Sequence, residues 1–397
     1  MRILIADKLS GTMVSQLTDS STQVRFEPEL TADELTHQVG DANILIVRST
    51  RVTRETIDQA PNLSLIIRAG AGVNTIDVQA ASSRGVYVTN CPGRNSAAVA
   101  ELAIGLLIAC DRRIVDASAA MRSGQWMKKE FGKAQGLQGR TLGILGLGTI
   151  GRAVARRATA LGMRVIGWSR SLTPGLAAEL GIEFAETPLQ LASECDAVSL
   201  HLAAAPETKK LVDAAFLAKL KTGAILVNTA RGDIIDVPAL KSAIAEKGLR
   251  TGLDVFTDEP GSGMADFQDT DLANLVTATP HIGASTEQAS EAIADEVVRI
   301  VRSIRETGRP VNAVNLCARS PATHSLVVRH FNRVGVIAGV LDALREEGIN
   351  VEEMDNTVFD GAAAACCTLQ LDQPPSTQLL TEVESIGNVL QVTLEAR

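Results

Sequence analysis

A glycine-rich turn that directly follows an apolar run constrains the fold of this chain more than any other feature. The run Thr141–Leu145 predicts a buried strand, and residues 146–151 then read Gly-Leu-Gly-Thr-Ile-Gly before a predicted helix, Arg152–Ala160. Between a strand and a helix this pattern is typical of a dinucleotide site. The first glycine permits a tight turn, the second lets a pyrophosphate approach the backbone, and the third lets helix and strand pack closely. The alternative is a glycine-rich turn in an ordinary parallel sheet.

The end of the next predicted strand lacks the residue that usually accompanies such a turn. An acidic side chain about 20 residues further on normally binds the adenosine 2′-hydroxyl. Here the strand Arg164–Gly167 is followed by Trp168-Ser169-Arg170-Ser171, without a carboxylate. Arg170, with the two serines, is suited to a 2′-phosphate. The alternative is an exposed arginine beside a permissive NAD site, so both NAD and NADP stay open.

Alternating strands and helices predict a doubly wound parallel sheet around this turn. The six strand candidates are Thr141–Leu145, Arg164–Gly167, Ala197–His201, Ala224–Asn228, Thr251–Val255 and Leu275–Ala278. This order is typical of a Rossmann-like α/β nucleotide domain. One Ala-rich helix over Ala97–Met121 is predicted before it, and an amphipathic helix over Thr286–Thr307 after it.

The two ends of the chain predict smaller domains, which fits a length of 397 residues. In the first 95 residues, strands over Arg2–Ala6, Asn43–Val47, Leu63–Ile67 and Val86–Val88 and helices over Glu29–Val39 and Thr53–Gln59 indicate a flavodoxin-like α/β unit. The tail reads strand Ser325–Arg329, helix Gly335–Glu347, strands Asn350–Val358 and Ala363–Leu371, helix Ser376–Ile386 and strand Val389–Thr393. This βαββαβ order is the ferredoxin-like α+β pattern.

Composition excludes several classes of partner. The net charge of −8 and the 3% of aromatic residues disfavour a nucleic-acid-binding surface. The longest apolar stretch, Leu102–Cys110, is far shorter than the ~20 residues of a membrane span. The six cysteines form no Cys-x-x-Cys pair, so no metal site is expected, and the N-terminus shows no signal-peptide pattern. We therefore expect a cytoplasmic protein with reduced thiols and no membrane or nucleic-acid partner.

Three polar residues follow predicted strands of the nucleotide domain. Arg231 follows Ala224–Asn228, Glu259 follows Thr251–Val255, and His281 follows Leu275–Ala278. Ligands of doubly wound sheets bind beyond the carboxyl ends of the strands, so the three side chains are expected to converge. Histidine suits proton transfer near neutral pH, a carboxylate orients it, and an arginine fork grips a substrate carboxylate. Each residue alone would more often be an ordinary loop side chain.

Together these segments resemble the D-isomer-specific 2-hydroxyacid dehydrogenase family over essentially residues 1–318. The matching stretches are 146–151, Ser199–Leu202 with Glu207-Thr208, Asn228–Gly232, Leu253–Val255 with Glu259-Pro260, and Pro280-His281. The resemblance implies that His281 is the acid/base, Glu259 its partner and Arg231 the carboxylate anchor. It implies a cofactor site of Gly146, Gly148, Thr149, Ile150, Gly151, Ser169, Arg170, His201, Thr208, Ala230, Asp254 and Gly283. Asp254 would face the nicotinamide carboxamide. Ala203 departs from the usual proline.

The resemblance also implies how the chain is organised. Residues 1–95 plus 283–318 would form a discontinuous substrate-binding domain, residues 96–282 the dinucleotide-binding domain, and residues 324–397 a regulatory tail of the ACT type. The helix from Ala97 would cross between domains and contribute to a dimer interface. A homodimer or homotetramer is therefore expected.

Within the family the chain is most similar to the subgroup that oxidises 3-phospho-D-glycerate, the first step of L-serine biosynthesis. The similarity lies in Val47–Ser49, Arg68–Val73, Asn95-Ser96 and Val99–Leu102. It implies that Arg48 and Arg68 bind a phosphorylated 2-hydroxy acid and that the backbone at Ala69 and Gly70 receives its carboxylate. Arg51, Lys128 and Lys129 are further candidate cations near the cleft.

The tail resembles serine-binding regulatory domains in His330, Asn332 and Asn350, although Val334 replaces the usual proline. This implies feedback inhibition by L-serine; the alternative is a tail that only dimerises through sheet edges. For the whole chain, an NADPH-dependent glyoxylate or hydroxypyruvate reductase is the second hypothesis. A nucleotide-sensing corepressor is the third, and the complete set of Arg231, Glu259 and His281 argues against it.

Overall fold

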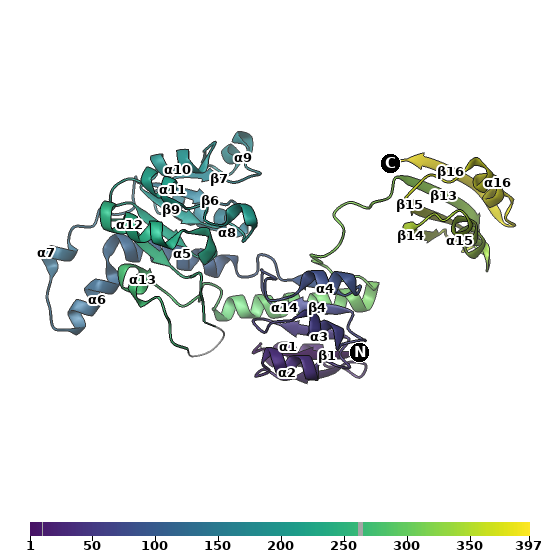
Figure 1. The fold of residues 1–397 in the computed structure, drawn as a ribbon, viewed down its shortest axis with the longest axis horizontal. Coiled ribbons are helices and arrows are strands. Elements are labelled where there is room, and N and C mark those ends of the chain that lie inside the picture. The colour runs from purple at the N-terminus through teal and green to yellow at the C-terminus, as the bar shows by residue number, and fades with distance from the viewer. Residues whose placement is uncertain (10, 261–264) are drawn as a thin grey trace. The chain divides into compact units, whose positions relative to one another are not determined.

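The computed structural model describes residues 1–9, 11–260 and 265–397 and divides into two compact units, Met1–Asn315 and Leu316–Arg397 (Figure 1). Three sheets account for the strands of the described residues: two parallel sheets in the first unit and one antiparallel sheet in the second. The boundaries predicted at residues 95 and 283 stay a prediction, because the first unit is compact as a whole.

The first parallel sheet has the order β2-β1-β3-β4-β5, which is the flavodoxin-like order. Its strands are β1 (Arg2–Ile5), β2 (Gln23–Phe26), β3 (Ile44–Val47), β4 (Leu65–Arg68) and β5 (Tyr87–Asn90). The helices are α1 (Gly11–Leu17), α2 (Ala32–Gln38), α3 (Arg54–Asp58) and α4 (Val78–Ser83). The sequence analysis missed β2, a polar edge strand, and the short helices α1 and α4.

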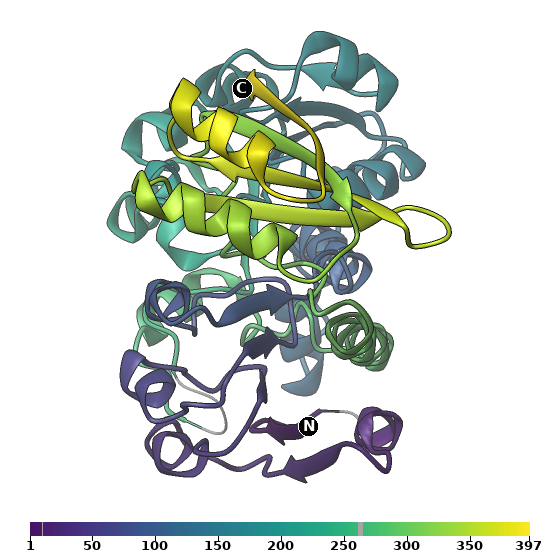
Figure 2. The same cartoon turned by 90° about the vertical axis from the view of Figure 1, so that its right-hand side faces the viewer.

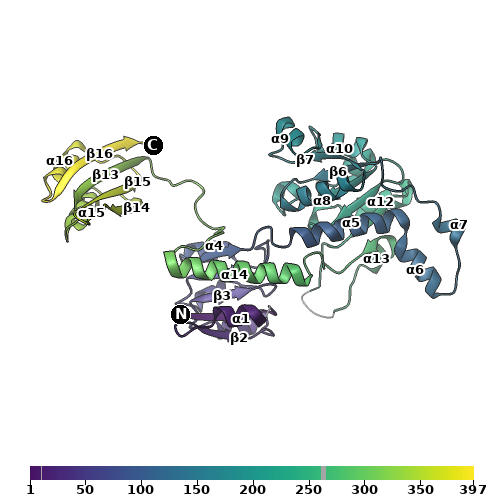
Figure 3. The ribbon, with the colours of Figure 1, turned by 180° about the vertical axis from the view of Figure 1, so that it is seen from behind.

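The long helix α14 (Glu287–Thr307) packs on this first sheet although it follows the second sheet in sequence (Figure 3). Ile293, Val297 and Ile300 are buried in one apolar cluster with alternate residues of β1, β3 and β4, while α2, α3 and α4 cover the other face. Such alternation is expected of strands buried on both faces.

The second parallel sheet has the order β12-β11-β10-β9-β6-β7-β8, and its direction of winding reverses between β9 and β6. Its strands are β6 (Thr141–Leu145), β7 (Arg164–Trp168), β8 (Glu183–Phe184), β9 (Ala197–Leu200), β10 (Ile225–Asn228), β11 (Arg250–Leu253) and β12 (Thr277–Ala278). All six predicted strands are confirmed, and β8 is a seventh. On one face lie α5 (Ser96–Arg112), α8 (Thr149–Ala160) and α9 (Pro174–Glu179); on the other lie α10 (Pro188–Glu194), α11 (Ala214–Lys219), α12 (Val237–Lys247) and α13 (Thr270–Leu275).

The single helix predicted over Ala97–Met121 is wrong, because the structure contains two helices there. Arg113 has a left-handed backbone (φ 50°) and separates α5 from α6 (Ile114–Arg122). Its side chain forms ion pairs with Asp116 and Glu130 and lies over the ring of Phe131 in α7 (Lys128–Phe131). These contacts stabilise the break against the cost of a non-glycine residue in this region.

The second unit is a four-stranded antiparallel sheet with two helices (Figure 2). Its elements are β13 (His324–Phe331), α15 (Val336–Glu346), β14 (Val351–Val358), β15 (Ala364–Leu371), α16 (Thr377–Ser385) and β16 (Val389–Ala396). The order β14-β15-β13-β16 is ferredoxin-like, as predicted. Within the described residues, no helix of either unit is long and apolar enough to cross a membrane.

Candidate active site

The glycine turn between β6 and α8 leaves room for a pyrophosphate. A side chain at Gly151 would place its Cβ 1.9 Å from the carbonyl oxygen of Gly146, and one at Gly146 (φ 97°) would lie 2.4 Å from the carbonyl oxygen of His201. At Gly148, by contrast, a Cβ would meet nothing within 4 Å. The turn therefore has no space for a side chain at Gly146 and Gly151, where helix and strand pack, but has free space at Gly148, the glycine expected to face the cofactor. This geometry fits a dinucleotide.

His201 follows β9, next to the point where the winding of the sheet reverses. Its Nε2 lies 2.8 Å from Ser199 Oγ, and its buried Nδ1 has no hydrogen-bond partner among the described residues. Burial lowers the pKa of His201 to about 3, so the ring is neutral at pH 7. Thr208 is engaged elsewhere, because its hydroxyl closes the loop 203–208 on the carbonyl oxygens of Ala203 and Ala205.

The other residues predicted to contact the nucleotide lie near the carboxyl ends of the strands of the second parallel sheet. Thr149 is bonded to Ser96 Oγ at 3.0 Å, Ile150 is half-buried, and Ala230 is buried. Ser169 and Arg170 follow β7; Arg170 is exposed and forms no ion pair among the described residues. Its guanidinium is therefore free to bind an anion.

His281 and Glu259 meet, as predicted. The distance from His281 Nδ1 to Glu259 Oε2 is 2.5 Å, and Glu259 Oε1 accepts the N–H of Phe256. Burial alone would raise the pKa of Glu259, but the hydrogen bonds from His281 and Phe256 outweigh it and that pKa is lowered. An ionised carboxylate on Nδ1 fixes the ring and leaves Nε2 for a substrate.

Arg231 is held beside this pair by its own loop. Asn228, fully buried, donates from its side chain to the carbonyl oxygen of Arg231 and accepts the N–H of Ala230. Gly232 lets the loop approach Phe256, since a Cβ there would lie 2.1 Å from that residue's carbonyl carbon. The positive charge of Arg231 helps to lower the pKa of Glu259, so the three predicted residues do converge.

Arg68 and Arg48 extend the positive charge of Arg231 into a cluster of three guanidinium groups. Burial lowers the pKa of Arg68, and the charges of Arg231 and Arg48 lower it further. Its Nε is buried and has no hydrogen-bond partner in the part of the chain that the structure describes. Like charges placed together, none of them in an ion pair with a described residue, indicate a site for an anionic ligand.

Two glycines provide the space that these arginines occupy. A Cβ at Gly70 would lie 1.6 Å from Arg68 Nη1, and one at Gly72 would lie 2.8 Å from Arg231 Nη2. The N–H of Ala69 donates to the carbonyl oxygen of Val47 and extends the pairing of β3 with β4, and the N–H of Gly70 donates to the carbonyl oxygen of Arg68 in a tight turn. The structure therefore does not support carboxylate binding by those two N–H groups.

Sequence reasoning missed two features next to the cluster. A cavity of about 80 Å³ is lined by Lys8, Leu9, Arg48, Ala69, Ser290 and Ile293. Asp7 Oδ2 accepts the N–H groups of Arg48, Ser49 and Thr50 and so fixes the loop that carries Arg48. Lys128 and Lys129 lie on α7, beside α6, rather than in the cluster.

The residues predicted to bind serine do not form one site within a chain. His330 is buried, with its ring nitrogens bonded to the carbonyl oxygen of Phe331 and to Asn356 Oδ1. Asn332 follows β13 and its side chain donates to the carbonyl oxygen of Ala362. Asn350 precedes β14; its N–H donates to the side chain of Asp372 and its own side chain donates to Glu352. Because β13 and β14 each pair antiparallel to β15, the two asparagines lie at opposite ends of the sheet, about 30 Å apart at a strand rise of about 3.3 Å per residue.

Comparisons with known proteins agree with this geometry. The profile of the family described as "D-isomer specific 2-hydroxyacid dehydrogenase, NAD binding domain" matches residues 104–283. A hydroxypyruvate reductase of Thermotoga maritima is 38% identical over 299 residues, which is 75% of this chain and 96% of that protein. The chain belongs to the D-isomer specific 2-hydroxyacid dehydrogenase family. The resemblance seen in the sequence is thereby confirmed.

Other members of the family are similar to most of the chain. A D-3-phosphoglycerate dehydrogenase of Methanocaldococcus jannaschii is 38% identical over 320 residues, 80% of this chain but 60% of that protein. The chain thus spans about three-fifths of the length of this relative and of a similar D-3-phosphoglycerate dehydrogenase of Mycobacterium bovis. The crystal structure of the TT0316 protein from Thermus thermophilus has a TM-score of 0.71 at 35% identity, covering 79% of this chain and all of that one. An NADPH-dependent glyoxylate/hydroxypyruvate reductase from Sinorhizobium meliloti, in complex with NADP and malonate, has a TM-score of 0.68 at 29% identity, covering 79% and 96%.

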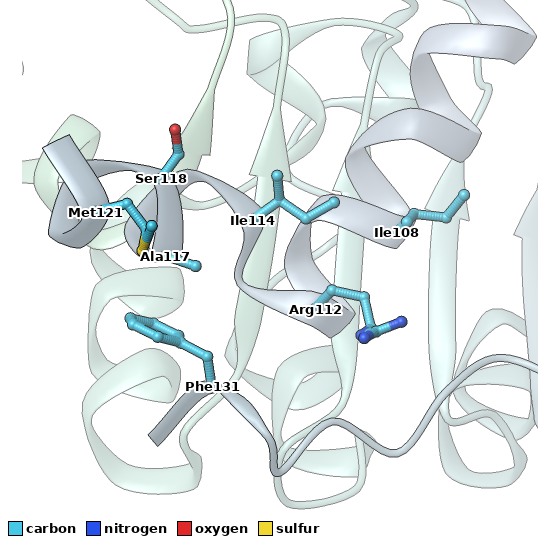
Figure 4. Close-up of a pocket in the computed structure, with 7 residues that line it drawn as sticks. All are labelled: Ile108, Arg112, Ile114, Ala117, Ser118, Met121 and Phe131. Carbon is cyan, nitrogen blue, oxygen red and sulfur yellow. The ribbon is translucent and has the colours of Figure 1, made fainter. Parts of the chain in front are cut away.

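A larger apolar hollow lies away from the arginine cluster, at the break between α5 and α6 (Figure 4). It has a volume of about 570 Å³ and is lined by Ile108, Arg112, Ile114, Ala117, Ser118, Met121 and Phe131. Trp126 and Met121 nearby are 77% and 55% exposed. No histidine or carboxylate is among the residues that line the hollow, so it lacks an acid/base pair like that of His281 and Glu259.

Proposed function

We propose that the chain oxidises 3-phospho-D-glycerate to 3-phosphohydroxypyruvate with NAD(P), the first step of L-serine biosynthesis. The observation that carries this proposal is the His281–Glu259 pair, 2.5 Å apart, beside three arginines that form no ion pair among the described residues. The phosphoglycerate dehydrogenases among the relatives support the same substrate.

The residues divide the reaction among them. Arg231 binds the substrate carboxylate and orients C2. His281 takes the proton of the C2 hydroxyl at Nε2, because Glu259 occupies Nδ1, and returns it in the reverse direction. Glu259, ionised at neutral pH, stabilises the imidazolium that forms. A nicotinamide dinucleotide held by Gly148 and the start of α8 at its pyrophosphate would supply the hydride acceptor for C2.

We place the substrate phosphate at Arg48 and Arg68, next to the small cavity lined by Lys8. Lys8 forms an exposed ion pair with Glu29 at 2.8 Å, which is weak enough to exchange for a phosphate. Three cations around a dianion would explain why the two arginines are left without ion pairs in the described part of the chain.

For the cofactor we propose NADP, on the basis of Arg170. Its guanidinium is exposed and unpaired among the described residues, and Ser169 flanks it at the end of β7. The Sinorhizobium reductase, which binds NADP, supports the use of NADP in this family.

A glyoxylate or hydroxypyruvate reductase is the second candidate, favoured by Arg170 and by the Thermotoga relative. The decisive experiment is a substrate panel of 3-phosphoglycerate, glyoxylate and hydroxypyruvate with NAD(H) and NADP(H). Turnover of phosphoglycerate supports the first proposal. Failure with phosphoglycerate and turnover of glyoxylate would replace it by the second, and no turnover of any would favour a binding protein.

We further propose that the tail is an ACT domain that senses L-serine and that the protein is a homo-oligomer. Because Asn332 and Asn350 lie at opposite ends of one sheet, a serine site that uses both needs two copies of the tail. The exposed apolar side chains of α6 and the following segment, Met121 and Trp126 among them, are the surface we assign to subunit contact. Titration with millimolar L-serine and light scattering test the two proposals.

A further inference from the structure

Thr279 lies two residues before His281 and bonds a buried carboxylate. Its hydroxyl donates to Asp254 Oδ1 at 2.6 Å, and Asp254 is 1% exposed. The other donors to this carboxylate are main-chain N–H groups, that of Ile282 at 2.8 Å and that of Gly283 at 2.9 Å. A buried carboxylate depends on such donors because water cannot replace them. Asp254 is thus tied to the chain on both sides of His281.

The backbone of His281 is in an unfavourable conformation within this turn. Its φ is 52°, in the left-handed region that non-glycine residues seldom adopt. Its N–H donates to the carbonyl oxygens of Asp254 at 2.8 Å and Thr279 at 3.0 Å. A conformation of this kind persists only where surrounding contacts enforce it. The direction of the imidazole toward Glu259 therefore depends on the turn 279–283.

We propose that Thr279 is a positioning residue for His281. The hydroxyl of Thr279 fixes the carboxylate of Asp254 by a hydrogen bond. That carboxylate accepts the N–H groups of the two residues after His281, so the imidazole of His281 keeps its contact with Glu259. The inference rests on the proposed function, in which His281 moves the proton. Thr279 itself needs no contact with substrate.

A pair of substitutions separates the hydroxyl from the shape of the side chain. Thr279→Val removes the donor at nearly constant volume, and Thr279→Ser keeps it. We expect Thr279→Val to lower kcat/KM by about 10- to 100-fold, because a displacement of ~1 Å in a catalytic group can have that effect. Thr279→Ser should stay within about threefold of the parent protein. Thr270→Val, at the exposed start of α13, is the matched control and should change nothing.

A double-substitution cycle then distinguishes positioning from a general structural role. In the background of His281→Asn, Thr279→Val should cause no further loss, since the group that it positions is gone. Equal losses in both backgrounds, or full activity of Thr279→Val, would overturn the inference while the proposed function stands. A fully active His281→Asn variant would overturn the proposed function and this inference with it. Circular dichroism and thermal unfolding accompany each variant, and Thr279→Ala replaces the valine variant if that one does not fold.

Discussion

Glu296 offers a quantitative test of how the first unit is held together. It lies on α14, is 2% exposed, and accepts hydrogen bonds from Arg94 at 2.6 Å, Arg299 at 2.5 Å and the side chain of Asn312 at 2.5 Å. Arg94 lies two residues before α5, so the network joins α14 to the start of the helix by which the chain enters the second parallel sheet. The hydrogen bond from Arg299, with those from Arg94 and Asn312, outweighs burial and lowers the pKa of Glu296 from 4.5 to about 2.

That shift converts into a free energy of unfolding. At about 1.4 kcal/mol per pKa unit, the ionised carboxylate stabilises the folded state by about 3 kcal/mol at pH 7. Because the folded-state pKa is the lower one, this contribution is complete above pH 4.5 and is lost as the pH falls towards 2. Less than half, roughly 1.4 kcal/mol, remains at pH 3.

The assay is urea unfolding of Glu296→Gln, followed by circular dichroism between pH 7 and pH 3. We expect the variant to be about 3 kcal/mol less stable than the parent at pH 7 and the deficit to shrink below pH 4.5. Glu291→Gln, the same change at an exposed position of α14, is the control and should stay within about 0.5 kcal/mol. A Glu296→Gln variant as stable as this control at pH 7, or a deficit independent of pH, would refute the reasoning.

Three further substitutions test the site. Arg170→Asp should raise the KM for NADP at least ~10-fold and leave the KM for NAD unchanged or lower, because the substitution exchanges a ligand of the 2′-phosphate for a ligand of the 2′-hydroxyl. An unchanged ratio of kcat/KM for the two cofactors would contradict the role of Arg170. Lys8→Met should raise the KM for 3-phosphoglycerate about 3- to 10-fold and leave the KM for hydroxypyruvate unchanged, because the variant loses one contact with the substrate phosphate. Equal effects on both substrates would mean that the phosphate does not bind beside Lys8. Gly151→Ala should abolish cofactor binding measured by calorimetry, because its Cβ would lie 1.9 Å from the carbonyl oxygen of Gly146; an intact Kd would contradict the fit of the glycine turn.

Much of the fold could be predicted because its signals are local. A few dozen residues are enough to show the glycine turn, the alternation of apolar strands with helices, or the βαββαβ order of the tail. The structure confirms these three features. The break at Arg113 could not be predicted in this way. It depends on Glu130 and Phe131, which are 17 and 18 residues away and come close only after the chain has turned back.

The candidate site shows the same division. His281, Glu259 and Arg231 were predictable because each follows a strand of one sheet, and parallel strands end at a common edge. Thr279 carries no sequence signal, since its partner Asp254 lies 25 residues earlier, just after the neighbouring strand β11. The separation of Asn332 from Asn350 likewise follows from the direction in which β13 and β14 pair with β15.

Gly72 is a position at which a substitution should change the preference of this enzyme among 2-hydroxy acid substrates. A methyl group added there would meet two side-chain tips, Arg231 Nη2 at 2.8 Å and Asn74 Oδ1 at 3.1 Å, and the backbone of Gly72 is not in the left-handed region. The long side chain of Arg231 can swing aside, so the methyl would move the residue that we propose as the carboxylate anchor while the loop stays folded. Under the proposed role of Arg231, Gly72 is therefore a position where a single methyl group should alter the choice of substrate more than the stability of the fold.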